Sequence, residues 1–398
     1  MQTRVYIGAA CTIVICAVLA GYVVPSRHVT YSNDAEQQAL ALTAVVPPPA
    51  TTTPPAFIVT HVQTPDPVKA VYFTSWAAGT ASFQKEMFSL LDGSTELDSV
   101  IIDVKDYSGR IGFAVNDPLL AAVGSAEDRI PDVEHLIGKL HDKGIYVIGR
   151  VAVFQDPYAT KVHPEWAVTN ATTGKRWADA SGAYWLDPDN HDAWAYIAAI
   201  AKQAYAVGFD EINFDYIRFP SEGALSDAVF ARPASTTRAE VITSFFAYLH
   251  DELSTMGIPI SADLFGQTTS ERNDMGIGQI IENALPYFDF VDPMVYPSHF
   301  APGFQGFTKP AQHPYEIVKY SMDQGVSRAV MASSTPSKLR PWLQAFDLGA
   351  IYTPAMVDAQ KQATYDAGLH SWLLWNAGAI YNREEVMAST TMATSTGI

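Results

Sequence analysis

The chain has 398 residues, of which 17% are charged and 12% aromatic, and its formal net charge is −17. This is the composition of a globular protein, and the acidic balance argues against nucleic acid or anionic membrane surfaces as partners, because both need basic patches. It suits a domain that acts on neutral or weakly charged material.

The first apolar segment, residues 5–24, reads "VYIGAACTIVICAVLAGYVV" and carries no charge over about 20 residues, enough for a helix to cross a bilayer. A short basic start, "MQTR", precedes it, which also fits a secretory signal. We expect an uncleaved single-pass membrane anchor with the N-terminus inside and an extracytoplasmic domain. The alternative is a cleaved signal and a secreted protein. Both cysteines, Cys11 and Cys16, lie here, so the rest of the chain has no disulfide or thiolate site.

Residues 25–66 have the composition of a linker. The stretch "VVPPPATTTPPAF" is rich in Pro and Thr, which favours an extended, semi-rigid and otherwise disordered chain. We expect one folded domain over residues 67–385. The low-complexity residues 386–398 are expected to form a disordered tail.

Within residues 67–385, apolar strand-like runs alternate with amphipathic helical runs. Two helical runs, residues 130–144 and 191–208, end in glycine, as expected at a helix C-terminus. Eight strand–helix units predict a (β/α)8 TIM barrel, and a doubly wound sheet is the alternative architecture. "SRAVMASS", from Ser327, is an alternative seventh strand. The eight predicted strands begin at or near Val68, Asp98, Gly144, Phe209, Ile258, Asp289, Lys338 and His370.

Acidic side chains in the fourth predicted strand, "GFDEINFDYIRFP", are expected to point into the barrel. Side chains alternate along a strand, so Glu211, Asn213 and Asp215 share one face and Ile212 and Phe214 share the other. The face toward the helices should be apolar, which leaves the polar set facing the barrel axis.

The same alternation applies to the second predicted strand. There, Ile102 and Val104 should face the helices, leaving Asp103 and Lys105 inward.

The candidate site lies where barrel enzymes place theirs, at the carboxyl ends of the strands. Two carboxylates converging there can cleave a glycosidic bond, one ionised and the other protonated. Asp215 and Asp263 end adjacent strands, whereas Asp103 lies two strands from Asp215. The candidate catalytic residues are Asp215, Asp263 and Asp103, and the candidate substrate-binding residues are Asn213, Arg218, Asp106, Arg150, Tyr296, Trp375 and Asn376.

Structural explanations compete with these roles. Asp215 could simply pair with Arg218 or Arg150, and Asp103 with Lys105. Asp263 could cap the turn that follows it. We expect Arg218 to orient a carboxylate by a bidentate contact.

The stretches "IIDVKDYSG", "YWLDPDN", "GFDEINFDYIRFP" and "LRPWLQAF" together resemble a family of glycoside hydrolase domains from bacterial extracytoplasmic proteins, related to α-amylase-like barrels. The resemblance covers roughly residues 68–382. It implies a TIM barrel with Asp215 as nucleophile and Asp263 as acid/base. The α-amylase-like acid is usually Glu, and the supporting Asp after strand seven is missing near "RPWLQ", so Asp103 is an alternative acid.

The sequence therefore predicts a glycosidase that cleaves a polysaccharide, with no cofactor and no metal. One alternative is a non-catalytic carbohydrate-binding barrel at the cell envelope. A third is a metal-dependent polysaccharide-modifying enzyme such as a deacetylase, although the ten His show no convincing ligand spacing.

Overall fold

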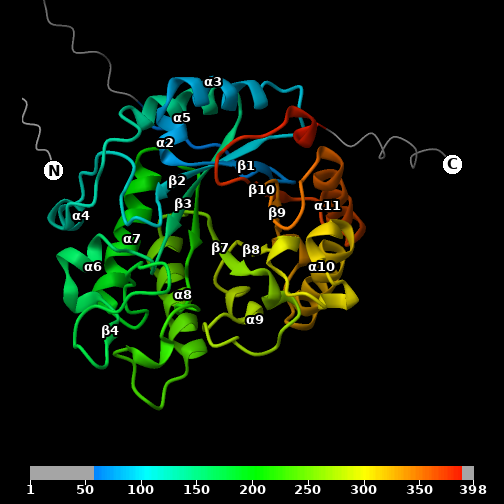
Figure 1. Cartoon of the computed structure of the whole chain (residues 1–398). Coiled ribbons are helices and arrows are strands. Elements are labelled where there is room, and N and C mark those ends of the chain that lie inside the picture. Colours follow the sequence, from blue (N-terminus) through cyan, green and yellow to red (C-terminus); the bar gives the residue numbers. More distant parts are fainter. Residues whose placement is uncertain (1–57, 388–398) are drawn as a thin grey trace, which may run out of the picture. The chain divides into compact units, whose positions relative to one another are not determined.

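The computed structural model describes residues 58–387, and these form a closed barrel of eight parallel strands wrapped by helices (Figure 1). Around the barrel the strands follow the order β1-β10-β9-β8-β7-β5-β3-β2. The predicted (β/α)8 TIM barrel is therefore confirmed. The strands are β1 (Lys69–Phe73), β2 (Ser99–Lys105), β3 (Tyr146–Ala152), β5 (Glu211–Asp215), β7 (Ile260–Phe265), β8 (Phe290–Met294), β9 (Trp342–Gln344) and β10 (Trp372–Trp375).

All eight predicted strands are present, including the seventh, β9, within "KLRPWLQAF". The alternative seventh strand from Ser327 is wrong, because that stretch belongs largely to the helix α10 (Pro314–Met331). Its buried residues, among them Ile317 and Val318, recur at helical spacing. A small antiparallel pair, β4 (Thr169–Asn170) and β6 (Ala228–Val229), lies outside the barrel sheet.

The helices form the outer layer in Figure 1, with α7 and α8 on one side of the barrel and α10 and α11 on the other. Besides α10 they are α2 (Ser75–Gly79), α3 (Ala81–Leu90), α4 (Pro118–Val123), α5 (Val133–His141), α6 (Ala159–Val162), α7 (His191–Ala206), α8 (Arg238–Ser254), α9 (Ile281–Ala284) and α11 (Pro354–Asp366). Short 3-10 turns occur at Pro164–Trp166, Leu225–Asp227, Gly266–Thr269, Pro297–His299, Phe304–Gly306, Pro310–Gln312, Pro336–Lys338 and Arg383–Val386.

The strand wall separates two apolar clusters. The larger lies between strands and helices and contains Ile102, Val104, Ile212 and Phe214, as alternation predicts. The smaller fills the barrel interior and includes Ala70, Ile101, Tyr146, Ile148 and Leu373. Polar side chains replace apolar ones inside the barrel near the carboxyl ends of β2, β3, β5 and β7, which is where the candidate site lies.

Three acids at the amino ends of strands hold the neighbouring strands in register. Asp98, Asp210 and Asp289 each precede a strand, and each carboxylate accepts the N–H of a residue that starts or adjoins the start of the adjacent strand. The donors are Lys69 N at 2.8 Å, Val147 N at 2.8 Å and Ile260 N at 2.9 Å. A buried N–H without a partner is costly, so these carboxylates stabilise the amino end of the barrel.

Residues 58–66 form a strap across this same amino end. Val62 N donates to Asp210 Oδ1 at 2.7 Å, and Thr64 Oγ1 donates to the Tyr146 hydroxyl at 3.0 Å. The Val62 side chain packs against the inner apolar cluster. Val62 and Thr64, which the sequence assigns to the linker, are therefore in contact with the barrel. Val386, beyond the predicted end of the domain, is also buried.

Within residues 58–387, none of the helices has both the length and the apolar composition to cross a membrane. The predicted membrane segment, residues 5–24, lies outside the described part of the chain. Its role stays a prediction.

Candidate active site

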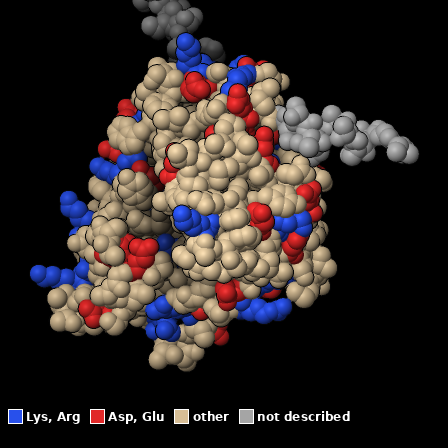
Figure 2. Space-filling model, turned by 45° about the vertical axis from the view of Figure 1, so that its right-hand side comes forward, with Lys and Arg blue, Asp and Glu red and all other residues tan. Residues whose placement is uncertain are grey.

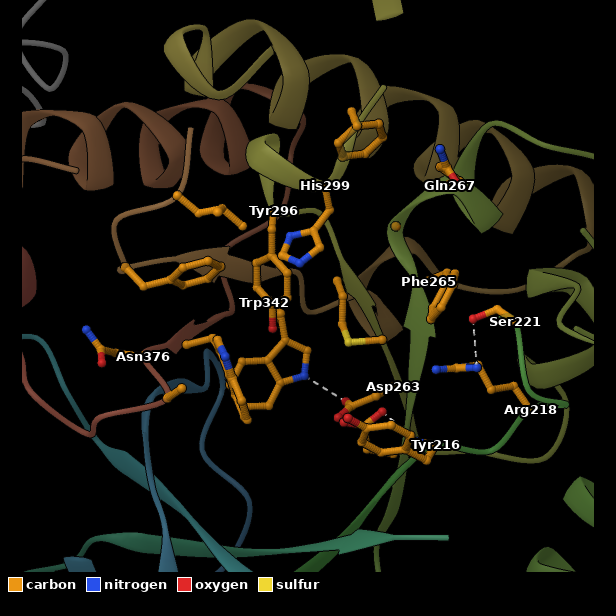
Figure 3. A pocket seen from close by; sticks show the side chains of 18 of the residues that line it. Tyr216, Arg218, Ser221, Asp263, Phe265, Gln267, Tyr296, His299, Trp342 and Asn376 are labelled. Atoms are coloured by element: carbon orange, nitrogen blue, oxygen red, sulfur yellow. Dashed lines mark hydrogen bonds between the residues drawn. The ribbon is translucent and has the colours of Figure 1, made fainter. Parts of the chain in front are cut away.

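A cavity of about 700 Å³ opens at the carboxyl ends of the strands. Asp215 and Asp263 lie at its base, beneath a wall of aromatic side chains that Figure 3 shows in part. The volume falls in the range of small-molecule sites. The other lining residues are Arg150, Tyr216, Arg218, Ser221, Glu222, Phe265, Gly266, Gln267, Met294, Tyr296, His299, Phe300, Trp342, Phe346, Leu348, Trp375, Asn376, Ala377 and Gly378.

Arg150, on β3, connects the three candidate catalytic acids. Its Nη1 donates to Asp103 Oδ1 at 2.8 Å, and its Nη2 donates to Asp215 Oδ2. Its Nε lies 3.9 Å from Asp263 Oδ2. The strand register explains this, because Arg150 is paired with Asp103 on β2 and with Asn213 on β5. One buried guanidinium thus compensates several buried carboxylates. A buried charge without such a partner would be strongly destabilising.

Two donors contact the Asp215 carboxyl group. Besides Arg150, the backbone N–H of Tyr216 donates to its Oδ1 at 2.6 Å. Tyr216 adopts a φ of 54°, a left-handed conformation that is unusual for an aromatic residue. Such backbone strain concentrates at functional sites, where the surrounding structure maintains it. Here the bend at Tyr216 aims its N–H at Asp215 and brings its ring into the cavity wall.

Asp263, on β7, lies on the neighbouring strand at the same depth as Asp215. The pairs Asn213–Ser261 and Phe214–Ala262 put these two acids next in register. Burial raises the pKa of Asp263 well above its usual value, and the charges of Asp215 and Asp292 raise this pKa further. The adjacent acids therefore differ in environment: Asp215 is contacted by a guanidinium and a backbone N–H, whereas burial favours the protonated form of Asp263.

Of the two oxygens of Asp263, Oδ2 is the one free to carry a proton. Its Oδ1 accepts hydrogen bonds from Asn213 Nδ2 at 2.8 Å and from Trp342 Nε1 at 2.7 Å (Figure 3). Its Oδ2 accepts none from the described residues, and its nearest cation is Arg150 Nε. An oxygen that accepts no hydrogen bond can carry the proton and donate it.

The sequence also suggests that Asp263 caps the turn that follows it. This is wrong, because Phe265 occupies the N-cap position of that turn.

Asp103 lies behind Arg150 and is not among the residues that line the cavity. Its Oδ2 accepts a 2.5 Å hydrogen bond from the Tyr72 hydroxyl. Burial raises the pKa of Asp103 to about 6, against the opposing charge of Arg150. The expected alternative pairing with Lys105 is wrong, because Lys105 Nζ pairs with Asp156 at 2.8 Å. These contacts favour a positioning role for Asp103, exerted through Arg150.

A second buried ion network lies deeper in the barrel. Arg340 donates to Asp292 at 2.9 Å through Nε and at 2.9 Å through Nη2, and to Glu211 Oε1 at 2.6 Å. Tyr146 and Ser261 also donate to Glu211, at 3.0 and 2.6 Å. Glu211 and Asp292 are therefore structural. Arg340 lies in the seventh predicted strand, but the sequence assigns it no role, because its partners come from two other strands.

Aromatic side chains line one side of the cavity and fix Arg150. The Trp375 ring stacks on Tyr72 with centroids 4.0 Å apart and lies 4.9 Å from the Arg150 guanidinium carbon. Trp342 meets Trp375 edge-on at 5.6 Å. Tyr296, predicted as a binding residue, lines the cavity next to His299 (Figure 3). Flat aromatic faces of this kind suit the apolar faces of sugar rings.

The structure separates the predicted binding residues into two groups. Arg150, Arg218, Tyr296, Trp375 and Asn376 line the cavity, whereas two others do not. Asn213 is fully buried beneath Asp263 and donates to it. Asp106 lies outside the lining and pairs with Arg129 at 2.6 Å.

Arg218 does not orient a carboxylate as the sequence predicts. Its Nη1 donates to Phe219 O at 3.1 Å and Ser221 Oγ at 3.2 Å, and it forms no ion pair within residues 58–387. Sequence reasoning also missed Phe265, His299 and Phe346. They belong to strand ends and loops whose course determines which side chains reach the cavity.

Among residues 58–387, no three His, Cys, Asp or Glu side chains converge in a way that would hold a metal ion.

No curated protein matches the chain.

Several solved structures are similar to this chain. A hypothetical protein from Ruminiclostridium thermocellum is 35% identical over 48% of this chain and 96% of its own, with a TM-score of 0.45. The glycoside hydrolase domain of PgaB (BpsB) from Bordetella bronchiseptica is 15% identical over 81% of this chain and 100% of its own, with a TM-score of 0.58. A chitobiase from Flavobacterium johnsoniae is 11% identical over 80% and 47%, with a TM-score of 0.51. The latter two likenesses show the fold alone.

A family model matches residues 70–381, which is nearly the whole barrel. The match includes every candidate site residue named above. The chain belongs to the family described as "Putative glycosyl hydrolase domain".

Proposed function

We propose that this protein hydrolyses glycosidic bonds of a polysaccharide, with Asp215 and Asp263 as the two working carboxyl groups. The observation that carries the proposal is the pairing of these acids around Arg150 at the base of an aromatic-walled cavity. Membership of a glycosyl hydrolase family and the fold shared with a glycoside hydrolase domain support it.

In the proposed reaction, Asp263 protonates the leaving glycosidic oxygen through Oδ2. Asp215 acts on the anomeric carbon, either as nucleophile or as the base that activates water. The bond from the anomeric carbon to the leaving oxygen breaks, and that oxygen keeps the electron pair and gains the proton of Asp263. Water supplies the new hydroxyl. Its other proton passes to Asp263 where Asp215 is the nucleophile, or to Asp215 where Asp215 is the base. Arg150 donates a hydrogen bond to Asp215 and orients its carboxyl group, and Asp103 keeps Arg150 in place.

The test is hydrolysis by the full-length protein in detergent. Neutral, amino-sugar and acidic polysaccharides are incubated with it, and new reducing ends are counted. The proposal expects reducing ends from at least one polymer, and their loss in the Asp215→Asn and Asp263→Asn variants. The matched control is Asp251→Asn, since Asp251 is an exposed acid on α8.

Two outcomes would favour the alternatives instead. Binding of a polymer without any new reducing ends would indicate a carbohydrate-binding barrel. Release of acetate that a chelator abolishes would indicate a metal-dependent deacetylase.

We also propose that residues 5–24 anchor this domain to a membrane, with the N-terminus inside and the barrel outside the cytoplasm. The uncharged length of this segment supports the proposal. Alkaline extraction of membranes tests it: an anchored protein stays in the pellet, and a protein with a cleaved signal appears in the soluble fraction.

A further inference from the structure

Arg218 differs from the other arginine of the cavity. Arg150 is neutralised by Asp103 and Asp215, whereas Arg218 has no ion-pair partner within residues 58–387. Burial lowers the pKa of its guanidinium, and the more distant charges of Asp215 and Glu222 offset this only in part. A partly buried cation without a paired anion is energetically unfavourable until an anion reaches it.

The side chain is fixed in place by aromatic rings. The guanidinium carbon lies 4.7 Å from the Phe265 ring centroid, 5.0 Å from that of Trp185 and 5.5 Å from that of Tyr216. Figure 3 shows Arg218 between Phe265 and Tyr216, on the side of the cavity opposite Trp342. Cation–π contacts hold the plane of the guanidinium but do not compensate its charge fully.

The free edge of Arg218 has the geometry that a carboxylate needs. Nη1 is used by Phe219 O and Ser221 Oγ, while Nε and Nη2 donate to no described residue. Neither nitrogen is among the buried polar atoms that lack a partner, so both reach solvent. Nε and Nη2 present two parallel N–H groups, which match the two oxygens of a carboxylate.

Two acids of the protein, Asp215 and Glu222, act on the charge of Arg218, and Asp215 already pairs with Arg150. Glu222 lines the cavity and is exposed, but it forms no ion pair with Arg218. General attraction of anions is also not expected, given the net charge of −17. On the face shown in Figure 2, basic and acidic side chains are interspersed. Selectivity for an anion would therefore come from Arg218 locally.

We propose that Arg218 forms a subsite for a carboxylate carried by a sugar, so that the substrate is an acidic glycan. This subsite rests on one part of the proposed function, namely that a sugar binds in the cavity. The carboxylate could belong to a uronic acid or to a carboxyalkyl ether on an amino sugar, which share the same planar anion.

The experiment measures binding to the full-length protein in detergent by ligand-detected NMR. Methyl β-glucuronide is compared with methyl β-glucoside, and N-acetylmuramic acid with N-acetylglucosamine. We expect Kd to be about tenfold lower for the acidic member of at least one pair, as for a bidentate charged contact. The pair that shows the preference identifies the source of the carboxylate.

Three variants separate the contributions. Arg218→Gln should abolish the preference, and Arg218→Lys should keep only part of it, because Lys has the charge without the paired donors. Arg272→Gln removes an exposed arginine away from the cavity and should keep the full preference.

Equal Kd values within both pairs, or a preference that survives Arg218→Gln, would overturn the subsite. Full preference in Arg218→Lys would overturn the bidentate contact. The binding measurement does not depend on hydrolysis. Selective binding without any cleavage would overturn the proposed hydrolase activity and support the subsite. Equal cleavage of acidic and neutral polymers would support the hydrolase activity and overturn the subsite.

Discussion

The indole N–H of Trp342 donates a 2.7 Å hydrogen bond to Oδ1 of Asp263, the acid that the proposed reaction requires in its protonated form. A donor of this kind stabilises the carboxylate and so opposes the effect of burial on the pKa. Trp342 therefore limits how far the pKa of Asp263 rises. This contact connects β9 to β7 across the barrel interior. It makes Trp342 a residue whose replacement should change the pKa of Asp263.

Replacing Trp342 by Phe should raise the pKa of Asp263, because it removes one donor to the carboxylate and keeps an aromatic ring. If Asp263 is the general acid, the basic limb of the kcat/KM profile moves to higher pH by about 1 unit. The pH–rate profile on a cleaved polymer measures this. A basic limb that stays in place or moves to lower pH would show that Asp263 does not set it.

Asp215→Asn should lower kcat by about 10³-fold or more, because the amide can neither attack the anomeric carbon nor activate water. Arg150 keeps Asp103 as an ion-pair partner, so the fold should persist. Circular dichroism on heating checks the fold, and steady-state hydrolysis checks kcat. Asp251→Asn should leave both unchanged, and near-wild-type activity in Asp215→Asn would remove this acid from the mechanism.

The titration of Asp103 should make stability depend on pH. Its pKa is about 6 in the folded protein, against an ordinary value of 3.8. Between these values the folded protein binds a proton that the unfolded chain has released. The free energy of unfolding should therefore fall as pH rises from about 4 to about 6.

Asp103→Asn cannot titrate, so we expect this slope to become shallower by about 1 kcal/mol per pH unit. Urea denaturation at several pH values measures it. Asp292, whose pKa is also raised to about 6 by burial, should preserve part of the slope in the variant. An unchanged slope in Asp103→Asn, equal to that of Asp251→Asn, would contradict the assignment.

Asp210→Ala should destabilise the barrel by about 2–4 kcal/mol, because its carboxylate accepts from Val62 N, Val147 N and His141 Nε2. Removing it leaves buried N–H groups without a partner and releases the strap. Chemical denaturation measures the loss, with the exposed Asp251→Ala as the control. A loss below about 0.5 kcal/mol would mean that water replaces the carboxylate.

The barrel could be predicted from the sequence because strand alternation is a local property. Ile212 and Phe214 are apolar where the helices cover them, and Asp215 follows at the inward position. Pairing between strands is not local. The sequence suggests Lys105 as the partner of Asp103, and only the register of β2 with β3 places Arg150 beside it instead.

The course of the loops after the strands is even harder to predict from the sequence than strand pairing. The left-handed Tyr216 redirects the chain beyond β5, so Arg218 enters the cavity wall without the carboxylate that its sequence context suggests. Nothing in "DYIRFP" signals a positive φ at a tyrosine. The aromatic partners of Arg218 come from three different segments, and their convergence depends on the completed fold.

The strap of residues 58–66 has a practical consequence. The chain joins the barrel at the amino ends of the strands, through Val62 and Thr64, while the cavity opens at the carboxyl ends. A resin, bead or fusion partner coupled ahead of residue 58 would be joined at the amino end of the barrel, opposite the cavity. Immobilised in this way, the protein would leave its cavity accessible to a long polymer chain.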